Sequence, residues 1–149
     1  MRLADILQPE RVAFLGSRDK ASALDDLCRL FASSPKVRDA RAFREAILRR
    51  EETLSTGIGL GLAVPHAKID SVTDFVLAVG VHHGGIDFDS LDKKPVHILT
   101  MVGTPSNRQR EYLQLLAQIT HLLKEEPIRQ DILQAPTPQD VYRIFAQEP

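Results

Sequence analysis

Apolar side chains recur every three or four positions in several segments, which is the spacing of a helix with one buried face. The first of these segments covers residues 19–31 and places Leu24, Leu27, Cys28 and Phe31 on that face. Cys28 is therefore expected to belong to the core and to take no part in chemistry.

A second helix is predicted to begin at Asp39, whose carboxylate suits an N-cap. Its inward face carries Phe43, Ala46 and Ile47, and its last turn points at a glycine-rich segment. The residues expected to face solvent are Arg44, Arg49 and Glu52.

Two more helices are predicted near the C-terminus. The first, a long amphipathic helix, carries on one face Tyr112, Leu115, Leu116, Ile119, Leu122 and Leu123. The second opens at Thr137-Pro138, where a capping residue precedes a proline in the first turn.

Between these helices lie apolar runs typical of strands. The two longest, Thr73 to Val81 and Val96 to Val102, show little polar alternation, which predicts strands covered on both faces. Shorter strands are predicted at Val12 to Leu15 and at Leu62 to Val64. Mixed strands and helices indicate an α/β domain with helices on both sides of one sheet.

Composition narrows the function classes. The 149 residues suit one domain, 1–149, and a formal charge of −1 with no basic block argues against nucleic-acid binding. One cysteine excludes an intramolecular disulfide, and the absence of a signal core predicts a cytoplasmic protein. The longest apolar run, Phe75 to Val81, is far shorter than the roughly 20 residues of a membrane span, so direct membrane insertion is not expected.

The segment STGIGLGLAVPHAK, residues 55–68, carries the candidate chemistry. Glycines at 57, 59 and 61 leave their backbone N–H groups unshielded by Cβ, which suits the approach of an anion. A mobile surface loop fits the same spacing equally well. A dinucleotide fingerprint fails at Leu62, and a Walker loop fails at Val64-Pro65-His66.

His66 is the candidate nucleophile. Pro65 fixes its own φ and favours an extended Val64, so the imidazole leaves a strand end in a set direction. A neutral imidazole offers one lone-pair nitrogen to a phosphoryl group without a separate base. Charge stabilisation would come from the glycine N–H groups, the hydroxyls of Ser55 and Thr56, and the guanidinium of Arg50. Taken alone, Arg50 reads as a solvated cation at a helix end.

Several motifs together resemble the EIIA domain of the fructose/mannitol type in the bacterial phosphoenolpyruvate-dependent sugar phosphotransferase system, a class that includes nitrogen-regulatory EIIA proteins. They are Arg50-Glu51-Glu52, Ser55-Thr56-Gly57-Ile58-Gly59, Ala63-Val64-Pro65-His66, Gly85-Ile86-Asp87-Phe88-Asp89-Ser90-Leu91-Asp92 and Lys94-Pro95-Val96. The resemblance covers essentially the whole chain. It implies a mixed sheet of about five strands flanked by helices.

The resemblance also implies a phosphocarrier without a cofactor. His66 would accept a phosphoryl group on Nε2 from the phosphohistidine of HPr and pass it to a cysteine of an EIIB domain. Arg50 matches the active-site arginine of the family, and Thr56 lies where the family keeps a hydroxyl near the phosphate. The residues expected to contact the phosphoryl group are Gly57, Ile58, Gly59, Leu60, Gly61 and Tyr112.

Two departures from the family pattern qualify these roles. Tyr112 stands where many members place a second histidine; its hydroxyl can donate a hydrogen bond but carries no positive charge. A less stabilised phosphohistidine or altered transfer kinetics is therefore expected. Leu60 stands where an asparagine is common, which removes one polar contact.

The other histidines show no spacing that predicts a metal site. They are His82, His83, His97 and His121. We interpret His82-His83 as a strand end beside a Gly84-Gly85 turn, and His121 as lying on the polar side of its helix.

From Glu51 to Asp92 the chain holds seven acids and one base, a local charge of about −6. This balance either steers a basic partner toward His66 or reflects ordinary solvated turns.

Three functions stay open at this point. The chain is a phosphocarrier of sugar transport, a regulatory EIIA that binds targets according to its phosphorylation state, or a small ligand-binding domain with an inert His66. The absence of attached EIIB and EIIC segments favours regulation.

Overall fold

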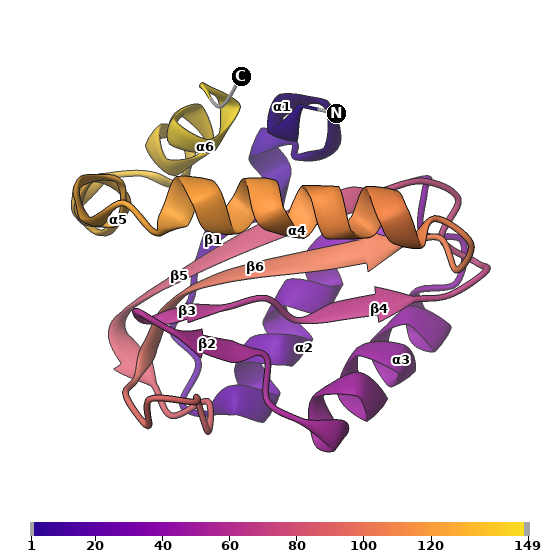
Figure 1. The fold of residues 1–149 in the computed structure, drawn as a ribbon, viewed down its shortest axis with the longest axis horizontal. Coiled ribbons are helices and arrows are strands. Elements are labelled where there is room, and N and C mark those ends of the chain that lie inside the picture. Colours follow the sequence, from indigo (N-terminus) through magenta and orange to yellow (C-terminus); the bar gives the residue numbers. More distant parts are fainter. Residues whose placement is uncertain (1, 148–149) are drawn as a thin grey trace.

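The computed structural model describes residues 2–147, in which five consecutive strands, β2 to β6, separate the N-terminal elements from three C-terminal helices (Figure 1). The strands are β1 (Val12–Phe14), β2 (Gly57–Gly59), β3 (Leu62–Ala63), β4 (His66–Lys68), β5 (Val76–Ile86) and β6 (Val96–Thr104). The α-helices are α1 (Leu3–Ile6), α2 (Lys20–Leu30), α3 (Ala40–Thr53), α4 (Gln109–Leu123), α5 (Glu126–Gln134) and α6 (Pro138–Ala146). Two 3-10 turns are η1 (Pro9–Arg11) and η2 (Phe31–Ser33).

The strands form one mixed six-stranded sheet in the order β1-β5-β6-β3-β2. The long central pair β5 and β6 is antiparallel, and β1 runs parallel to β5 on one side. On the other side β3 and β4 pair with β6 in succession, both parallel, and β2 closes the edge against β3. The α/β class with one mixed sheet is thus confirmed, with six strands where about five were expected.

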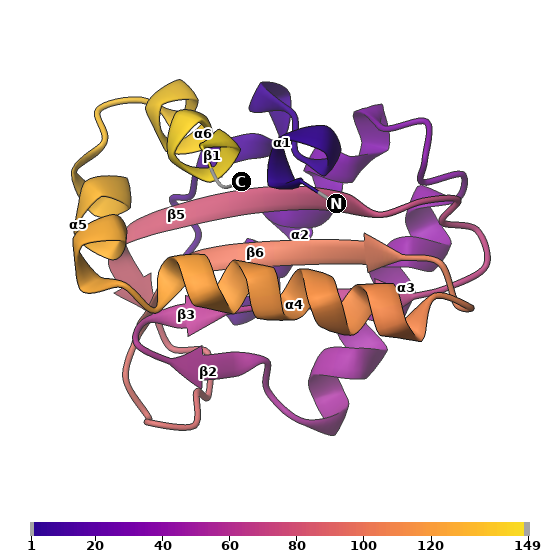
Figure 2. The same cartoon turned by 45° about the horizontal axis from the view of Figure 1, so that its top comes forward.

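Helices cover both faces of the sheet. Figures 1 and 2 show α4, α5, α6 and α1 on one side and α2 and α3 on the other. Alternate residues of β5 follow the two faces: Leu77 and Val79 belong to the core under α4, whereas Val76 and Ala78 belong to the core under α2 and α3. The unbroken apolar run therefore reflects a strand buried on both faces, as predicted.

Side-chain caps fix the predicted helix starts. Each capping residue accepts a hydrogen bond from the backbone N–H three positions later, which satisfies a donor that the helix leaves unpaired. The pairs are Asp19 with Ser22, Asp39 with Ala42, and Thr137 with Asp140. Cys28 lies in the core as expected, and burial raises the pKa of its thiol to about 12.

The predicted turn at Gly84-Gly85 is wrong. Strand β5 continues through His82 and His83 to Ile86, which pairs with Val96 after a register shift that begins at Val81. The glycines form an irregularity inside the strand, where Gly85 adopts a φ of +82° that suits a residue without Cβ. No helix among residues 2–147 is long and apolar enough to cross a bilayer.

Candidate functional site

Helix α3 brings Arg50 to the site. Phe43 and Ile47 face the sheet from this helix, and Arg50 follows Ile47 by three positions, so it emerges at the border of the buried face. Its Nη1 donates a hydrogen bond of 2.7 Å to the carbonyl oxygen of Leu54, just beyond the end of the helix. This contact ties the guanidinium to the segment that follows α3.

His66 opens strand β4, and its ring orientation is fixed locally. Nδ1 lies 3.0 Å from the carbonyl oxygen of Val64. Because a carbonyl oxygen only accepts, Nδ1 carries the proton, and Nε2 of the neutral ring keeps the lone pair. The carbonyl of Pro65 accepts a 2.9 Å hydrogen bond from the N–H of Val102 in β6, which anchors the backbone before the ring.

The surroundings of His66 favour the neutral imidazole. Partial burial is the largest effect and lowers the pKa of the ring below its ordinary value of 6.5. The hydrogen bond to Val64 and the charge of Glu51 act in the opposite direction, and the positive charges of Arg50 and Lys68 lower the pKa further. A ring that stays neutral keeps the Nε2 lone pair available.

Tyr112 and Lys68 lie on the α4 side of the imidazole. The ring centroids of His66 and Tyr112 are 5.2 Å apart, and the rings are tilted by 38°. Lys68 places its ammonium 4.9 Å from the centroid of Tyr112 and donates a 2.6 Å hydrogen bond to Oε1 of Gln109. The structure thus brings Tyr112 to His66 as expected.

A pocket of about 380 Å³ opens at His66 between α3 and β4. Three of its lining residues are basic, Arg49, Arg50 and Lys68, and none is acidic. The negative balance of residues 51–92 therefore does not describe this pocket, which is suited to an anion. Of the residues expected at the site, His66 and Arg50 both line it.

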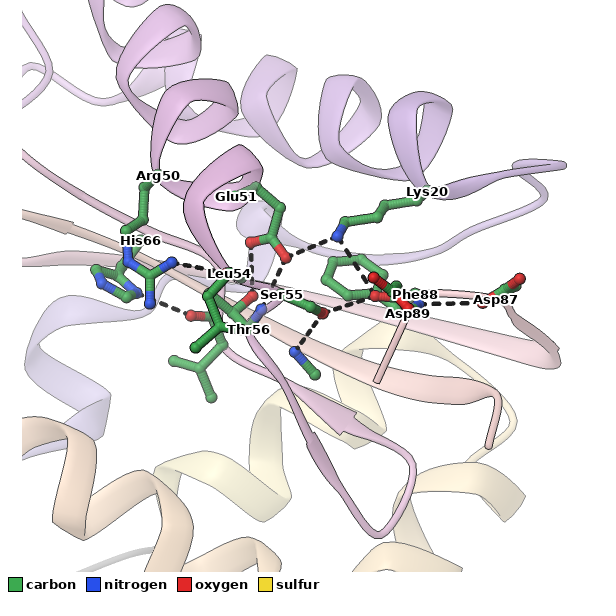
Figure 3. Close-up of polar contacts among 12 residues, drawn as sticks. Lys20, Arg50, Glu51, Leu54, Ser55, Thr56, His66, Asp87, Phe88 and Asp89 are labelled. Carbon is green, nitrogen blue, oxygen red and sulfur yellow. Dashed lines mark hydrogen bonds and ion pairs between the residues drawn. The ribbon is translucent and has the colours of Figure 1, made fainter. Parts of the chain in front are cut away.

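Thr56 is held by a buried carboxylate (Figure 3) and does not line the pocket. The Glu51 side chain, 4% exposed, accepts hydrogen bonds from the backbone N–H of Thr56 at 2.8 Å and from its hydroxyl at 2.7 Å. Lys20 of α2 completes the group with Nζ 3.0 Å from the same carboxylate. Both donors of Thr56 are therefore engaged within the protein.

The glycine segment forms a hairpin, not an open loop. Strand β2 pairs with β3 through a turn in which Gly59, Leu60 and Gly61 have φ values of +95°, +60° and +76°. The N–H of Gly57 donates to the Ser55 hydroxyl at 3.1 Å, so this donor too is engaged.

The turn of this hairpin lies away from the histidine. Leu62 pairs with Ile98 and His66 with Val102, four positions farther along β6, which is about 13 Å along a strand. None of the residues from Gly57 to Gly61 lines the pocket at His66. The structure therefore does not bring the expected glycine cradle to the imidazole.

Sequence reasoning missed two residues of this site. The sequence pattern identifies Lys68 only as a base, because it does not predict β4; a strand there puts positions 66 and 68 on one face. The sequence identifies Glu51 only as part of a motif, because its contact with Lys20 joins residues that no local pattern connects. Among residues 2–147, no group of three or more His, Cys, Asp or Glu side chains is placed to hold a metal ion.

Comparison with known proteins agrees with this geometry. The family described as "Phosphoenolpyruvate-dependent sugar phosphotransferase system, EIIA 2" matches residues 5–148. A fructose-specific EIIA component of Haloferax volcanii is 34% identical over 86% of this chain and 83% of its own length. A nitrogen regulatory protein of Pseudomonas aeruginosa is 32% identical over 97% of this chain and 94% of its own length.

Longer relatives contain the same unit. The fructose-specific EIIABC component of Bacillus subtilis is 32% identical over 99% of this chain, which corresponds to only 23% of that protein.

Solved structures share the fold. Nitrogen regulatory protein IIA-Ntr from Neisseria meningitidis superposes with a TM-score of 0.87 at 23% identity, covering 96% of this chain and 98% of that one. The mannitol enzyme IIA of Escherichia coli, solved in complex with phosphorylated enzyme IIB, gives 0.79 at 18% identity, covering 95% and 99%. The extent of the family match and the level of identity establish that the chain belongs to the EIIA type 2 family of the phosphoenolpyruvate-dependent sugar phosphotransferase system.

Proposed function

We propose that His66 is the phosphoryl acceptor of this EIIA protein, loaded by the phosphohistidine of HPr and discharged to a cysteine of an EIIB partner. One observation carries the proposal: Nδ1 donates to the Val64 carbonyl, which leaves the Nε2 lone pair free at a pocket lined by cations. Membership of the family and the enzyme IIB complex of a structural relative support the choice of partners.

Phosphoryl transfer between the two histidines needs no added base. The Nε2 lone pair forms the new P–N bond while the P–N bond of the donor breaks, and its electron pair stays on the donor ring. With Nδ1 still protonated, the His66 ring gains the positive charge that the donor ring loses. The Val64 carbonyl stabilises that charge, because a hydrogen bond to a charged N–H is stronger than one to a neutral N–H.

Arg50 supplies electrostatic stabilisation. A guanidinium has five N–H donors, so the bond to Leu54 leaves others for the phosphoryl oxygens. Phosphoryl transfer passes through a loose transition state in which positioning and charge neutralisation do most of the work. Holding Arg50 against Leu54 provides that positioning before the donor arrives.

A regulatory role is the second candidate. The Pseudomonas nitrogen regulatory protein and the Neisseria IIA-Ntr structure both match over more than nine tenths of this chain. In that role the phosphoryl group on His66 would change the affinity of the surrounding surface for a target protein. Phosphoryl transfer to an EIIB cysteine favours the carrier role, whereas binding that depends on phosphorylation, without such transfer, favours the regulator.

Intact-mass spectrometry tests the acceptor. The protein is incubated with phosphoenolpyruvate, enzyme I and HPr, and wild type is compared with His66→Ala and with His121→Ala, a control on the exposed side of α4. We expect one acid-labile phosphoryl group on the wild type and on the control, and none on His66→Ala. A phosphoryl group retained by His66→Ala would contradict the proposal, and so would an unmodified wild type with an active donor system.

A further inference from the structure

Lys68 shares a strand face with His66. The two residues occupy the first and third positions of β4, so their side chains leave the same face, while the intervening Ala67 is buried on the opposite side. Pairing of β4 with β6 fixes this register, with His66 opposite Val102 and Lys68 opposite Thr104. The backbone thus places the side chains of Lys68 and His66 side by side on one face of β4.

Helix α4 determines where the ammonium lies. Its first residue, Gln109, accepts the 2.6 Å hydrogen bond from Lys68 Nζ, and one turn later Tyr112 offers its ring face at 4.9 Å. The same Tyr112 ring lies 5.2 Å from the His66 ring. The Tyr112 ring therefore contacts both side chains, and it holds the lysine charge by a cation–π contact.

The charge of Lys68 remains available to an anion. Two other cations, Lys20 and Arg108, are paired with carboxylates: Lys20 with Glu51, and Arg108 with both Asp74 and Glu111. The hydrogen-bond partner of Lys68 is instead the neutral amide of Gln109. An ammonium has three donors, so this bond leaves N–H groups for another acceptor.

We infer that Lys68 is a phosphoryl-binding residue, the counterpart on β4 of Arg50 on α3, and that the two cations hold the phosphoryl group on His66 from opposite sides. The inference rests on the proposed function of His66. Both cations line the pocket with the imidazole, and both lower the pKa of the ring through their charge. A phosphoryl group on Nε2 brings about two negative charges to this place, which a single guanidinium leaves partly uncompensated.

The test measures the equilibrium of phosphoryl transfer between HPr and this protein. Lys68→Met removes the charge and keeps the stem, Lys68→Arg restores a cation, and Lys124→Met is a control at the far end of α4. A charge-assisted hydrogen bond predicts that Lys68→Met lowers the equilibrium constant for loading by about 10-fold to 100-fold. Lys68→Arg is expected to recover most of this loss, and Lys124→Met to match the wild type.

Phosphorus NMR separates direct contact from a structural effect. A cation in contact with the phosphoryl oxygens stabilises their dianion, so Lys68→Met should raise the pKa of the phosphoryl group by about one unit. If the equilibrium constant for loading in Lys68→Met equals that of the wild type, the inference is overturned. It is overturned as well if this constant falls while the pKa of the phosphoryl group stays unchanged.

The neighbouring amide provides a second variant. Gln109→Glu keeps the size of the side chain but supplies a carboxylate that competes with the phosphoryl oxygens for Lys68, so loading should weaken. Stronger loading would contradict the role of Lys68. In all these variants His66 still takes one phosphoryl group, whereas failure of the proposed function would appear as a phosphoryl group that survives His66→Ala.

Discussion

The two halves of the segment from Ser55 to Lys68 use their polar groups in opposite ways. In the glycine half, the Ser55 hydroxyl donates to the carbonyl of Phe88, and Thr56 donates twice to Glu51. In the histidine half, His66 and Lys68 line an open pocket. The comparison teaches that the polar groups of the first half hold the structure together, whereas side chains of the second half and of α3 remain available for the proposed phosphoryl transfer.

This division predicts that substitutions supporting the first half cost stability, whereas substitutions around the second half cost phosphoryl transfer. The largest effect is expected at Glu51. Glu51→Ala removes the acceptor of both Thr56 donors and leaves Lys20 without its carboxylate, which should lower the free energy of unfolding by about 3 kcal/mol. Urea denaturation measures this change.

The adjacent residue is the matched control for Glu51. Glu52 is exposed on the same helical turn, so Glu52→Ala should change the free energy of unfolding by no more than about 0.5 kcal/mol. Equal effects of the two substitutions would show that the buried carboxylate does not hold the glycine half in place.

Arg50→Gln should separate chemistry from stability. Removing a preorganised charged donor is expected to slow phosphorylation by HPr about 100-fold, with a stability change below about 1 kcal/mol because the residue is only half-buried. Single-turnover rates measure the effect. The control is Arg41→Gln, on the exposed first turn of the same helix. An unchanged rate in Arg50→Gln would show that the guanidinium takes no part in the transfer.

Gly57→Ala tests the packing of the glycine half. A Cβ at this position would lie 2.7 Å from the Ser90 Oγ and 3.0 Å from its Cα, so the backbone must shift. We expect a loss of about 1 to 3 kcal/mol in the free energy of unfolding and phosphorylation that is retained in the folded protein. Gly16→Ala, with nothing within 4 Å of the added Cβ, should show no such loss. A stable Gly57→Ala protein that cannot be phosphorylated would show that the glycine backbone contributes to the site.

The smallest effect concerns the titration of His66. Because burial and the neighbouring cations lower the pKa of the ring, NMR titration should give a midpoint below 6.5. The unfolded chain then binds the proton more readily, so the contribution of His66 to stability is complete above about pH 6.5 and is lost as pH falls below it. Arg50→Gln should raise the midpoint, and a wild-type midpoint above 6.5 would contradict the described environment.

Much of the fold follows from local patterns. The caps at Asp19, Asp39 and Thr137 and the apolar run of β5 are properties of neighbouring residues, so the sequence alone locates these elements. Strands β2 and β4 have three residues each and form because β3 and β6 pair with them, which no local pattern expresses. The local pattern does not predict helix α5 either, because Ile132 is the single buried side chain among its nine residues.

The candidate site was predicted in part for the same reason. His66 and Arg50 belong to motifs, and the structure brings both to one pocket. The glycine spacing suited an anion cradle, but the pairing of β2 with β3 directs that backbone elsewhere. Lys68 depends on its contact with Gln109 of α4, and Glu51 on its contact with Lys20 of α2; each partner lies more than 30 residues away in the sequence.

The most direct test of the central claim locates the phosphoryl group on the imidazole. Protein labelled with ¹⁵N in its histidines is phosphorylated through HPr, and phosphorus–nitrogen couplings identify the bonded atom. The account predicts coupling to Nε2 of His66, with Nδ1 still protonated and hydrogen-bonded to the Val64 carbonyl. Coupling to Nδ1, or to a nitrogen of another histidine, would contradict it.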